Sequence, residues 1–184
     1  MPHLRFTTAR DLFEAFETAR EDITVEPSDS PSLQFVNALV AAGDLRNAVS
    51  FCAYLLPRRE AVWWACQSVR AISGRVSGDD DASLQAAEAW VNEPEEQQRW
   101  AALDLGMAGE KTSAATWAAL AAGWSGGAMV RNDHGAGLAP AHATPKAVIA
   151  AILICTATMQ REVRDRHLLN CVQSATQLAT AEGR

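Results

Sequence analysis

Apolar residues recur along most of the chain at the three- and four-residue spacing that is typical of amphipathic α-helices. In the stretch 58–73, one face of a helix would carry Val62, Ala65, Cys66, Val69 and Ile72. No stretch of useful length alternates between apolar and polar residues, as a half-buried strand would. The sequence therefore predicts an all-α fold.

Capping residues, prolines and glycines divide the sequence into seven or eight predicted helices. Thr8 with Asp11 forms a capping-box pattern, Asp44 is placed to cap a helix, and Gly43 and Gly74 are typical helix terminators. We expect helices at residues 9–21, 32–42, 45–56, 58–73, 82–91, 95–108, 114–124 and 144–181.

The expected connections are mostly about two to eight residues long, which is typical of antiparallel helical hairpins. Ser30 and Pro31 are expected to begin the second helix, Thr112 or Ser113 to cap the seventh, and the last helix has a candidate kink near Gln160. Successive hairpins resemble a short α-solenoid, although the sequence has no fixed repeat period. At 184 residues we expect a single helical domain over 1–184, in which 1–30 form an N-terminal helix and an extended connection.

The adjacent tryptophans of the stretch 58–73 are expected to have different environments. Trp64 lies opposite the apolar face and among small residues, which favours cover by a second neighbouring helix. Trp63 falls on the only strongly polar side, at the boundary of the core. We call this side the tryptophan strip and consider it a candidate partner-binding site; it consists of Arg59, Trp63, Gln67 and Arg70.

Charge and composition narrow the classes of partner. The chain has 16 basic and 22 acidic residues, a net charge of −6, and no basic patch, so we expect neither a nucleic-acid partner nor a membrane partner. The most apolar run, 147–159, is shorter than the roughly 20 residues that cross a bilayer. The four isolated cysteines and the polar N-terminal stretch are typical of a cytoplasmic protein with reduced thiols.

The stretch GWSGG, residues 123–127, matches the G-x-S-x-G pattern of a serine-hydrolase nucleophile elbow. An elbow requires a strand before Ser125 and a helix after it, whereas the sequence predicts an alanine-rich helix before Ser125 and a Gly/Pro-rich loop after it. The neighbouring Asp133 and His134 are also badly placed to complete a triad. We therefore interpret GWSGG as a helix C-terminus followed by a turn, and we predict no catalytic residues.

The long Gly/Pro-rich loop 125–143 carries Asp133, His134 and His142, which are metal-binding residue types. Their spacing lacks a helical histidine pair or a supporting carboxylate pair, so we expect a mobile polar loop and no metal. The run 79–81 is three aspartates without the alternating ligands of a calcium loop, and we interpret it as a solvated run that ends in a helix cap. No cofactor is expected.

Three segments resemble a family of small helical bacterial proteins of unknown function, DUF6931. The segments are LPRREAVWWAC (56–66), AAEAWVNEPEEQQRWAA (86–102), and TWAALAAGWSGGAM (116–129) with ATPKAVIAAILI (143–154), and the resemblance covers about residues 35–160. Its most specific positions are Leu56, Pro57, Arg59, Glu60, Ala61, Val62, Trp63 and Trp64, followed by Trp124, Ser125, Gly126 and Gly127. The family has no known catalytic residues, and its members are often encoded beside type VI secretion genes.

These observations lead to two functional hypotheses. The first is a non-enzymatic helical adaptor that binds another protein, with a type VI secretion component as the partner that the resemblance implies. The alternative is a small-molecule-binding or enzymatic helical domain with its site under the 125–143 loop. A homo-oligomer is compatible with both.

Overall fold

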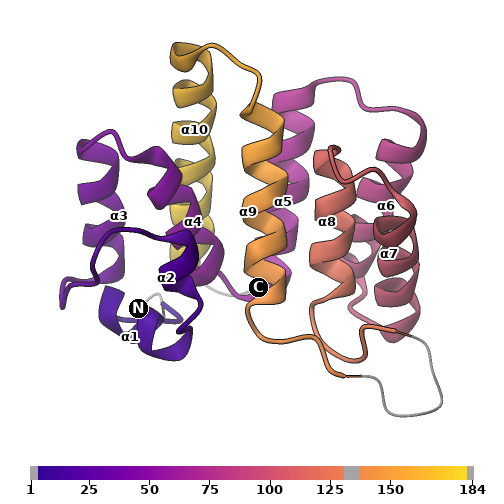
Figure 1. Ribbon diagram of the computed structural model, residues 1–184, viewed down its shortest axis with the longest axis horizontal. Helices are drawn as coiled ribbons and strands as arrows, with labels where there is room; N and C mark the ends of the chain where they lie inside the picture. The colour runs from indigo at the N-terminus through magenta and orange to yellow at the C-terminus, as the bar shows by residue number, and fades with distance from the viewer. Residues whose placement is uncertain (1–3, 131–136, 182–184) are drawn as a thin grey trace. The chain divides into compact units, whose positions relative to one another are not determined.

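The computed structural model describes residues 4–130 and 137–181, and its secondary structure is helical (Figure 1). The helices in these residues are α1 (Ala9–Ala15), α2 (Ala19–Asp22), α3 (Ser32–Ala41), α4 (Leu45–Leu55), α5 (Arg58–Ser73), α6 (Gly78–Asn92), α7 (Glu96–Ala108), α8 (Ala114–Gly123), α9 (Ala143–Thr156) and α10 (Arg161–Thr180). The only strand-like pairings among them are two isolated bridges, Thr8 with Pro31 and Ala128 with Leu138. The predicted all-α class is confirmed.

The described residues contain ten helices, because two predicted helices are each divided. The first ends where the backbone of Phe16 leaves the helical region (φ −131°, ψ 86°), and the buried Phe16 ring packs edge-on against Tyr54 at 5.1 Å. The last is broken rather than kinked, since Gln160 adopts φ −59° and ψ 148° ahead of α10.

Three predicted helix caps are confirmed, and the cap predicted at Ser30 is wrong. Thr8 and Asp11 form the capping box, and Asp44 and Ser113 cap α4 and α8 through their side chains. Ser30 does not cap α3, because its hydroxyl shares a 2.6 Å hydrogen bond with Ser28 instead.

The aspartate run also lies differently from the prediction. Helix α6 begins at Gly78, so Asp79, Asp80 and Asp81 lie in its first turn rather than in a loop before it. Carboxylates at this position are stabilised by the positive end of the helix dipole, which extends the helix into a run that looks like a loop in the sequence.

The chain divides into two compact units. Unit 1 is discontinuous in sequence and consists of Met1–Pro57 with Met159–Arg184, whereas unit 2 is the continuous stretch Arg58–Thr158. Unit 1 therefore contains α1–α4 and α10, and unit 2 contains α5–α9. The single domain over 1–184 stays a prediction.

Unit 1 has an aromatic core. The rings of Phe13, Phe35 and Phe51 contact one another, with the closest centroids 4.8 Å apart. Helix α4 is buried along most of its length and packs against both α3 and α10. The guanidinium of Arg5 lies over the rings of Phe6 and Phe16 and donates to the Leu56 carbonyl at 3.1 Å, which ties the start of the described chain to the end of α4.

Unit 2 is built around α8, which contacts α5, α6, α7 and α9 (Figure 1). Every residue of α8 except Trp117 is buried, and most of these residues are alanine. Two glycines let α7 and α8 approach closely: a Cβ at Gly106 would lie 2.9 Å from the backbone nitrogen of Leu120, and a Cβ at Gly123 would lie 2.7 Å from the Cα of Leu103. Small residues are therefore a steric requirement of this helix pair.

None of the helices within residues 4–130 and 137–181 combines the length and the apolar character that crossing a bilayer requires.

The paired tryptophans of α5 have the environments that the helical periodicity predicts, with Trp64 1% exposed and Trp63 36% exposed. We expect Trp64→Ala to leave a cavity and lower the free energy of unfolding by about 3–5 kcal/mol. Trp63→Ala should lower it by only about 1–2 kcal/mol, because much of its ring already contacts water. Denaturant melts of the two variants measure both values, and an equal or larger loss for Trp63→Ala would contradict the assignment.

Candidate functional site

The GWSGG stretch forms the end of α8 and the turn that follows it. Gly123 is the last residue of α8, and the amide of Trp124 still donates to the Leu120 carbonyl at 2.8 Å. A helix thus precedes Ser125 where a nucleophile elbow requires a strand. Gly127 has a φ of 70°, which favours glycine after a helix end. The interpretation as a helix C-terminus and turn is confirmed.

A buried arginine holds this turn in place. Arg99 of α7 is 2% exposed, and its Nη1 donates to the carbonyls of Gly123 (2.7 Å) and Ala128 (3.0 Å). The opposite side of the guanidinium forms a bidentate pair with Glu96, at 2.7 and 2.8 Å. A Cβ at Gly127 would lie 3.0 Å from Nη2 of Arg99, so a larger residue there would require the guanidinium to shift, in addition to adopting the positive φ of 70°.

Two further contacts fix the same turn. Arg58, the first residue of α5, donates to the Ser125 carbonyl at 2.9 Å. The ring of Trp124 packs edge-on against Trp117 at 6.4 Å, and the Trp117 indole donates to the Lys111 carbonyl at 2.8 Å. GWSGG is therefore a structural signature. Its glycines leave room for the Arg99 side chain, and its backbone carbonyls accept hydrogen bonds from Arg58 and Arg99.

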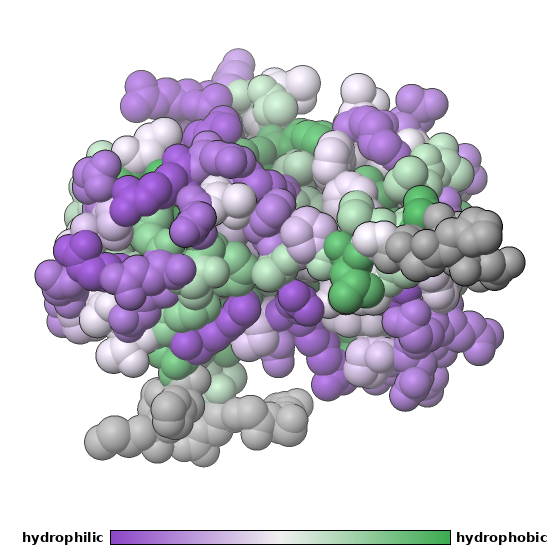
Figure 2. Space-filling view, turned by 60° about the horizontal axis from the view of Figure 1, so that its bottom comes forward, coloured by the Kyte–Doolittle hydropathy of each residue, from purple (hydrophilic) through white to green (hydrophobic). Residues whose placement is uncertain are grey.

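After this turn an isolated antiparallel bridge joins two short segments, which we call the anchored hairpin (residues 127–130 and 137–139). Ala139 N donates to the Gly127 carbonyl at 2.9 Å, and Met129 N donates to the Gly137 carbonyl at 3.3 Å. Val130 is 51% exposed and Leu138 is 73% exposed, although both are large apolar residues. Figure 2 shows hydrophobic residues, in green, among the polar ones on the face of the molecule that it displays.

The metal hypothesis for the 125–143 loop rests largely on residues outside the described ones. Asp133 and His134 lie in the gap between 130 and 137, and His142 is the N-cap of α9 without a side-chain capping bond. Within residues 4–130 and 137–181, no group of three or more His, Cys, Asp or Glu side chains is arranged to hold a metal ion.

The two arginines of the tryptophan strip contact α6. Arg59 donates to the Val91 carbonyl at 2.5 Å. Arg70 makes a bidentate pair with Glu88 (2.6 and 2.9 Å) and a further bond to Asp81 (3.0 Å), and these hydrogen bonds raise the pKa of its guanidinium. Both arginines thus join α5 to α6.

Trp63 and Gln67 are the other two strip residues, and both are exposed. The role of the four residues in partner binding stays a prediction. The spacing within α5 correctly groups them on one side, but it cannot reveal that α6 supplies partners for the two arginines.

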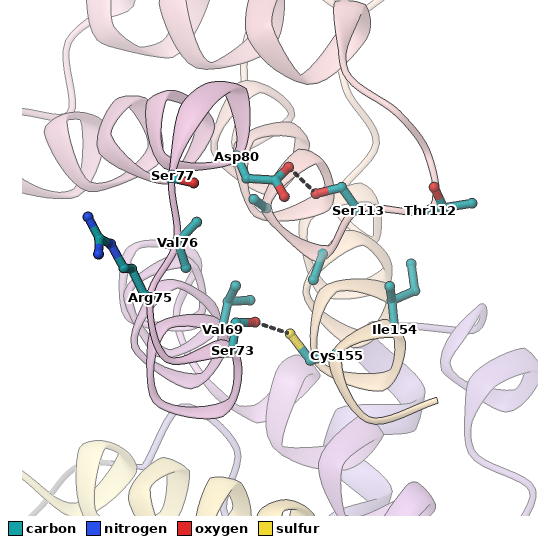
Figure 3. A pocket seen from close by; sticks show the side chains of 12 residues that line it. Val69, Ser73, Arg75, Val76, Ser77, Asp80, Thr112, Ser113, Ile154 and Cys155 are labelled. Carbon is teal, nitrogen blue, oxygen red and sulfur yellow. Dashed lines mark hydrogen bonds between the residues drawn. The ribbon is translucent and has the colours of Figure 1, made fainter. Parts of the chain in front are cut away.

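A polar pocket of about 350 Å³ lies at the other end of unit 2 from the 125–143 loop (Figure 3). It is formed where α5 and α9 end and where α6 and α8 begin. Its lining residues are Val69, Ser73, Arg75, Val76, Ser77, Asp80, Thr112, Ser113, Ala114, Ala115, Ile154 and Cys155. The sequence places the alternative site under the loop and misses this pocket, because its lining comes from three separate segments, 69–80, 112–115 and 154–155.

Two hydrogen-bonded pairs face each other across the pocket (Figure 3). The Ser113 hydroxyl donates to Asp80 Oδ1 at 2.5 Å, and the Ser73 hydroxyl lies 3.6 Å from the Cys155 sulfur. Burial raises the pKa of the Cys155 thiol, and the negative charge of Asp80 adds to the effect. The thiol is therefore protonated at neutral pH and poorly nucleophilic.

The close approach of α8 to α7 predicts different effects for two substitutions in the GWSGG turn. Gly123→Ala places a methyl group against the Leu103 backbone and should lower the free energy of unfolding by about 1–3 kcal/mol. Ser125→Ala should change it by less than about 1 kcal/mol, because Arg58 bonds the backbone carbonyl, which the substitution keeps. Urea melts of both variants test the pair, and a harmless Gly123→Ala would contradict the packing.

The Arg99–Glu96 pair predicts a pH dependence. The guanidinium holds the pKa of the Glu96 carboxyl below its ordinary value, chiefly through their hydrogen bonds. This contribution to stability is complete above the ordinary glutamate pKa of about 4.3 and is lost as the pH falls through the lower folded value. Glu96→Gln should therefore be less stable than wild type at pH 7, and the gap should close on acidification. Melts across this range measure it, with Glu95→Gln as the control.

The sequence was compared with known families, proteins and structures. The sequence profile of a family of unknown function, DUF6931, matches residues 35–179, from α3 into α10. Neither a curated protein nor a solved structure matches the chain. The match includes Arg58, Arg99 and the GWSGG turn, so the arginine-held turn lies inside the family region. The chain belongs to DUF6931.

Proposed function

We propose that this protein is a non-enzymatic helical adaptor that binds another protein through the anchored hairpin. The observation that carries the proposal is the exposure of two large apolar side chains, Val130 and Leu138, on the anchored hairpin. The Ala128 carbonyl of this hairpin accepts a hydrogen bond from the buried Arg99. Exposed apolar groups that are clustered rather than scattered are typical of protein-binding sites.

The anchoring gives the hairpin a property that binding sites need. Arg99 bonds the Ala128 carbonyl at 3.0 Å, and Arg58 bonds the Ser125 carbonyl at 2.9 Å, so the base of the hairpin is ordered before any partner arrives. An ordered base reduces the conformational entropy that binding would otherwise cost. The tryptophan strip offers a second, weaker candidate surface, since Trp63 is exposed while Arg59 and Arg70 bond α6.

The proposed setting is the bacterial cytoplasm, and the proposed partner class is a component of a type VI secretion system. The support for both is the family membership, together with the association of family members with type VI secretion genes. Binding of a small molecule is the second candidate function, and the pocket between Asp80 and Cys155 favours it.

The adaptor proposal predicts that the hairpin side chains govern capture of the partner. The double variant Val130→Ser with Leu138→Ser should weaken capture of a specific protein from the native host by at least about tenfold, because buried apolar anchors dominate binding. Both side chains are exposed, so thermal melts of the variant should match wild type. Quantitative pull-down in mild salt is the measurement.

Two controls make this result specific. Met107→Ser removes another exposed apolar side chain, 57% exposed on α7, and should leave capture unchanged. Loss of capture in Trp63→Ser with full capture by the hairpin variant would move the site to the tryptophan strip. Recovery of the wild-type protein without any specific companion would count against the adaptor function itself.

A further inference from the structure

We propose that the pocket formed by the α5–α6 connection, the start of α8 and the end of α9 binds a small organic cation. The cation is an aliphatic amine that is protonated at neutral pH. This inference is independent of the adaptor function, because the pocket and the anchored hairpin lie at opposite ends of α8 and α9.

The sign of the ligand's charge follows from the charged residues of the lining. Asp80 and Arg75 are the two ionised residues among them. The Arg75 guanidinium is turned away from Ile154 and Cys155, whereas the Asp80 carboxylate faces Ser113 (Figure 3). One formal charge, negative, is therefore directed toward the space that a ligand would fill.

The Asp80 carboxylate retains hydrogen-bonding capacity. Its Oδ1 accepts the Ser113 hydroxyl at 2.5 Å, which fixes the direction of the carboxylate. Its Oδ2 accepts no hydrogen bond from the described residues. An ammonium group carries several N–H donors and no acceptor, so it matches this oxygen better than a neutral alcohol does.

The helix ends do not change this sign. Helices α6 and α8 present their positive N-terminal ends at the pocket, and α5 and α9 present their negative C-terminal ends. The partial charges of two starts and two ends largely cancel. Asp80 is then the charge that selects the ligand.

The size and the walls of the pocket define the rest of the ligand. A volume of about 350 Å³ lies within the range of small-molecule sites and is far larger than a single ion needs. Val69, Val76 and Ile154 form apolar walls between the Asp80–Ser113 pair and the Ser73–Cys155 pair (Figure 3). Four or five methylene groups would cover these walls, with the ammonium group on Asp80. A metal ion fits poorly, because the described lining offers one carboxylate and no group of three metal-ligating side chains.

The test uses three probes of equal length: n-butylamine, n-butanol and butyrate. Amide chemical shifts of the full chain are followed during titration at pH 7 with each probe. We expect n-butylamine to shift the amides of residues 113–115 and 73–77 in a saturable manner, with the neutral and anionic probes at least about tenfold weaker. Equal binding of n-butanol or butyrate, or no saturable shift at these amides with n-butylamine, would overturn the proposal.

Paired variants assign the binding to Asp80. Asp80→Asn should weaken n-butylamine binding about tenfold, because it removes the charge and keeps the shape. Asp79→Asn is the matched control: it changes the neighbouring carboxylate, which is not part of the lining, and should bind as wild type does. Equal losses in the two variants would show a general effect of negative charge at the α6 N-terminus and would refute the site.

A third variant locates the ligand. Cys155 is half-buried, whereas Cys52, Cys66 and Cys171 are buried. A maleimide should therefore modify Cys155 selectively when labelling is carried out at alkaline pH, where more of this thiol is ionised, before binding is measured at pH 7. Modification should abolish n-butylamine binding in wild type by filling the pocket, and Cys155→Ser treated in the same way should retain it. Full binding by the modified wild-type protein would place the amine elsewhere and reject the pocket.

Discussion

The buried guanidinium of Arg99 is the interaction on which the arrangement of unit 2 near the end of α8 depends. An isolated charge is costly to remove from water, so a buried arginine persists only when its donors are paired. The carboxylate of Glu96 supplies the countercharge by accepting bonds from Nε and Nη2, and the carbonyls of Gly123 and Ala128 accept the bonds from Nη1. These carbonyls belong to the end of α8 and to the hairpin, so satisfying one side chain fixes the course of the chain between them.

This arrangement requires the small residues around it. The carbonyl of Gly123 comes within 2.7 Å of Arg99 at a point where α8 also passes close to the Leu103 backbone. A larger residue at Gly123 or Gly127 would push the turn away from α7 or from the guanidinium. The Gly-x-Ser-x-Gly pattern and Arg99, 24 residues before its first glycine, thus depend on each other for their packing. The packing of a helix end against an arginine therefore accounts for the pattern in a helical protein.

The fold is predictable from the sequence where local rules decide it, and unpredictable where partners from distant segments do. Caps at Thr8, Asp44 and Ser113 depend on residues three positions away, and all three are confirmed. Ser30 follows the same local rule but bonds Ser28, because the first turn of α3 pairs with the segment before α1: Ser32 N donates to the Thr7 carbonyl and the Ser32 hydroxyl to the Phe6 carbonyl.

The candidate sites show the same division. Helical periodicity separates Trp63 from Trp64 correctly, because burial follows the phase of a single helix. It cannot pair Arg70 with Glu88 or bring Asp80 to Ser113, since those partners are 18 and 33 residues apart and meet only through packing. The one local signal for Arg99 is Glu96, three residues earlier, and on a surface helix that spacing is commonplace.

The order of the two units along the chain has a consequence for synthesis on the ribosome. In the sequence, unit 2 is a continuous stretch between the two segments of unit 1, so all its helices emerge before α10 does. Until then α4, which packs against α2, α3 and α10, lacks the cover that α10 provides. A nascent chain thus carries uncovered apolar surface for the time needed to translate about a hundred residues, roughly 5–20 s. During this interval unit 1 is incomplete, and its uncovered apolar surface favours aggregation until α10 has emerged.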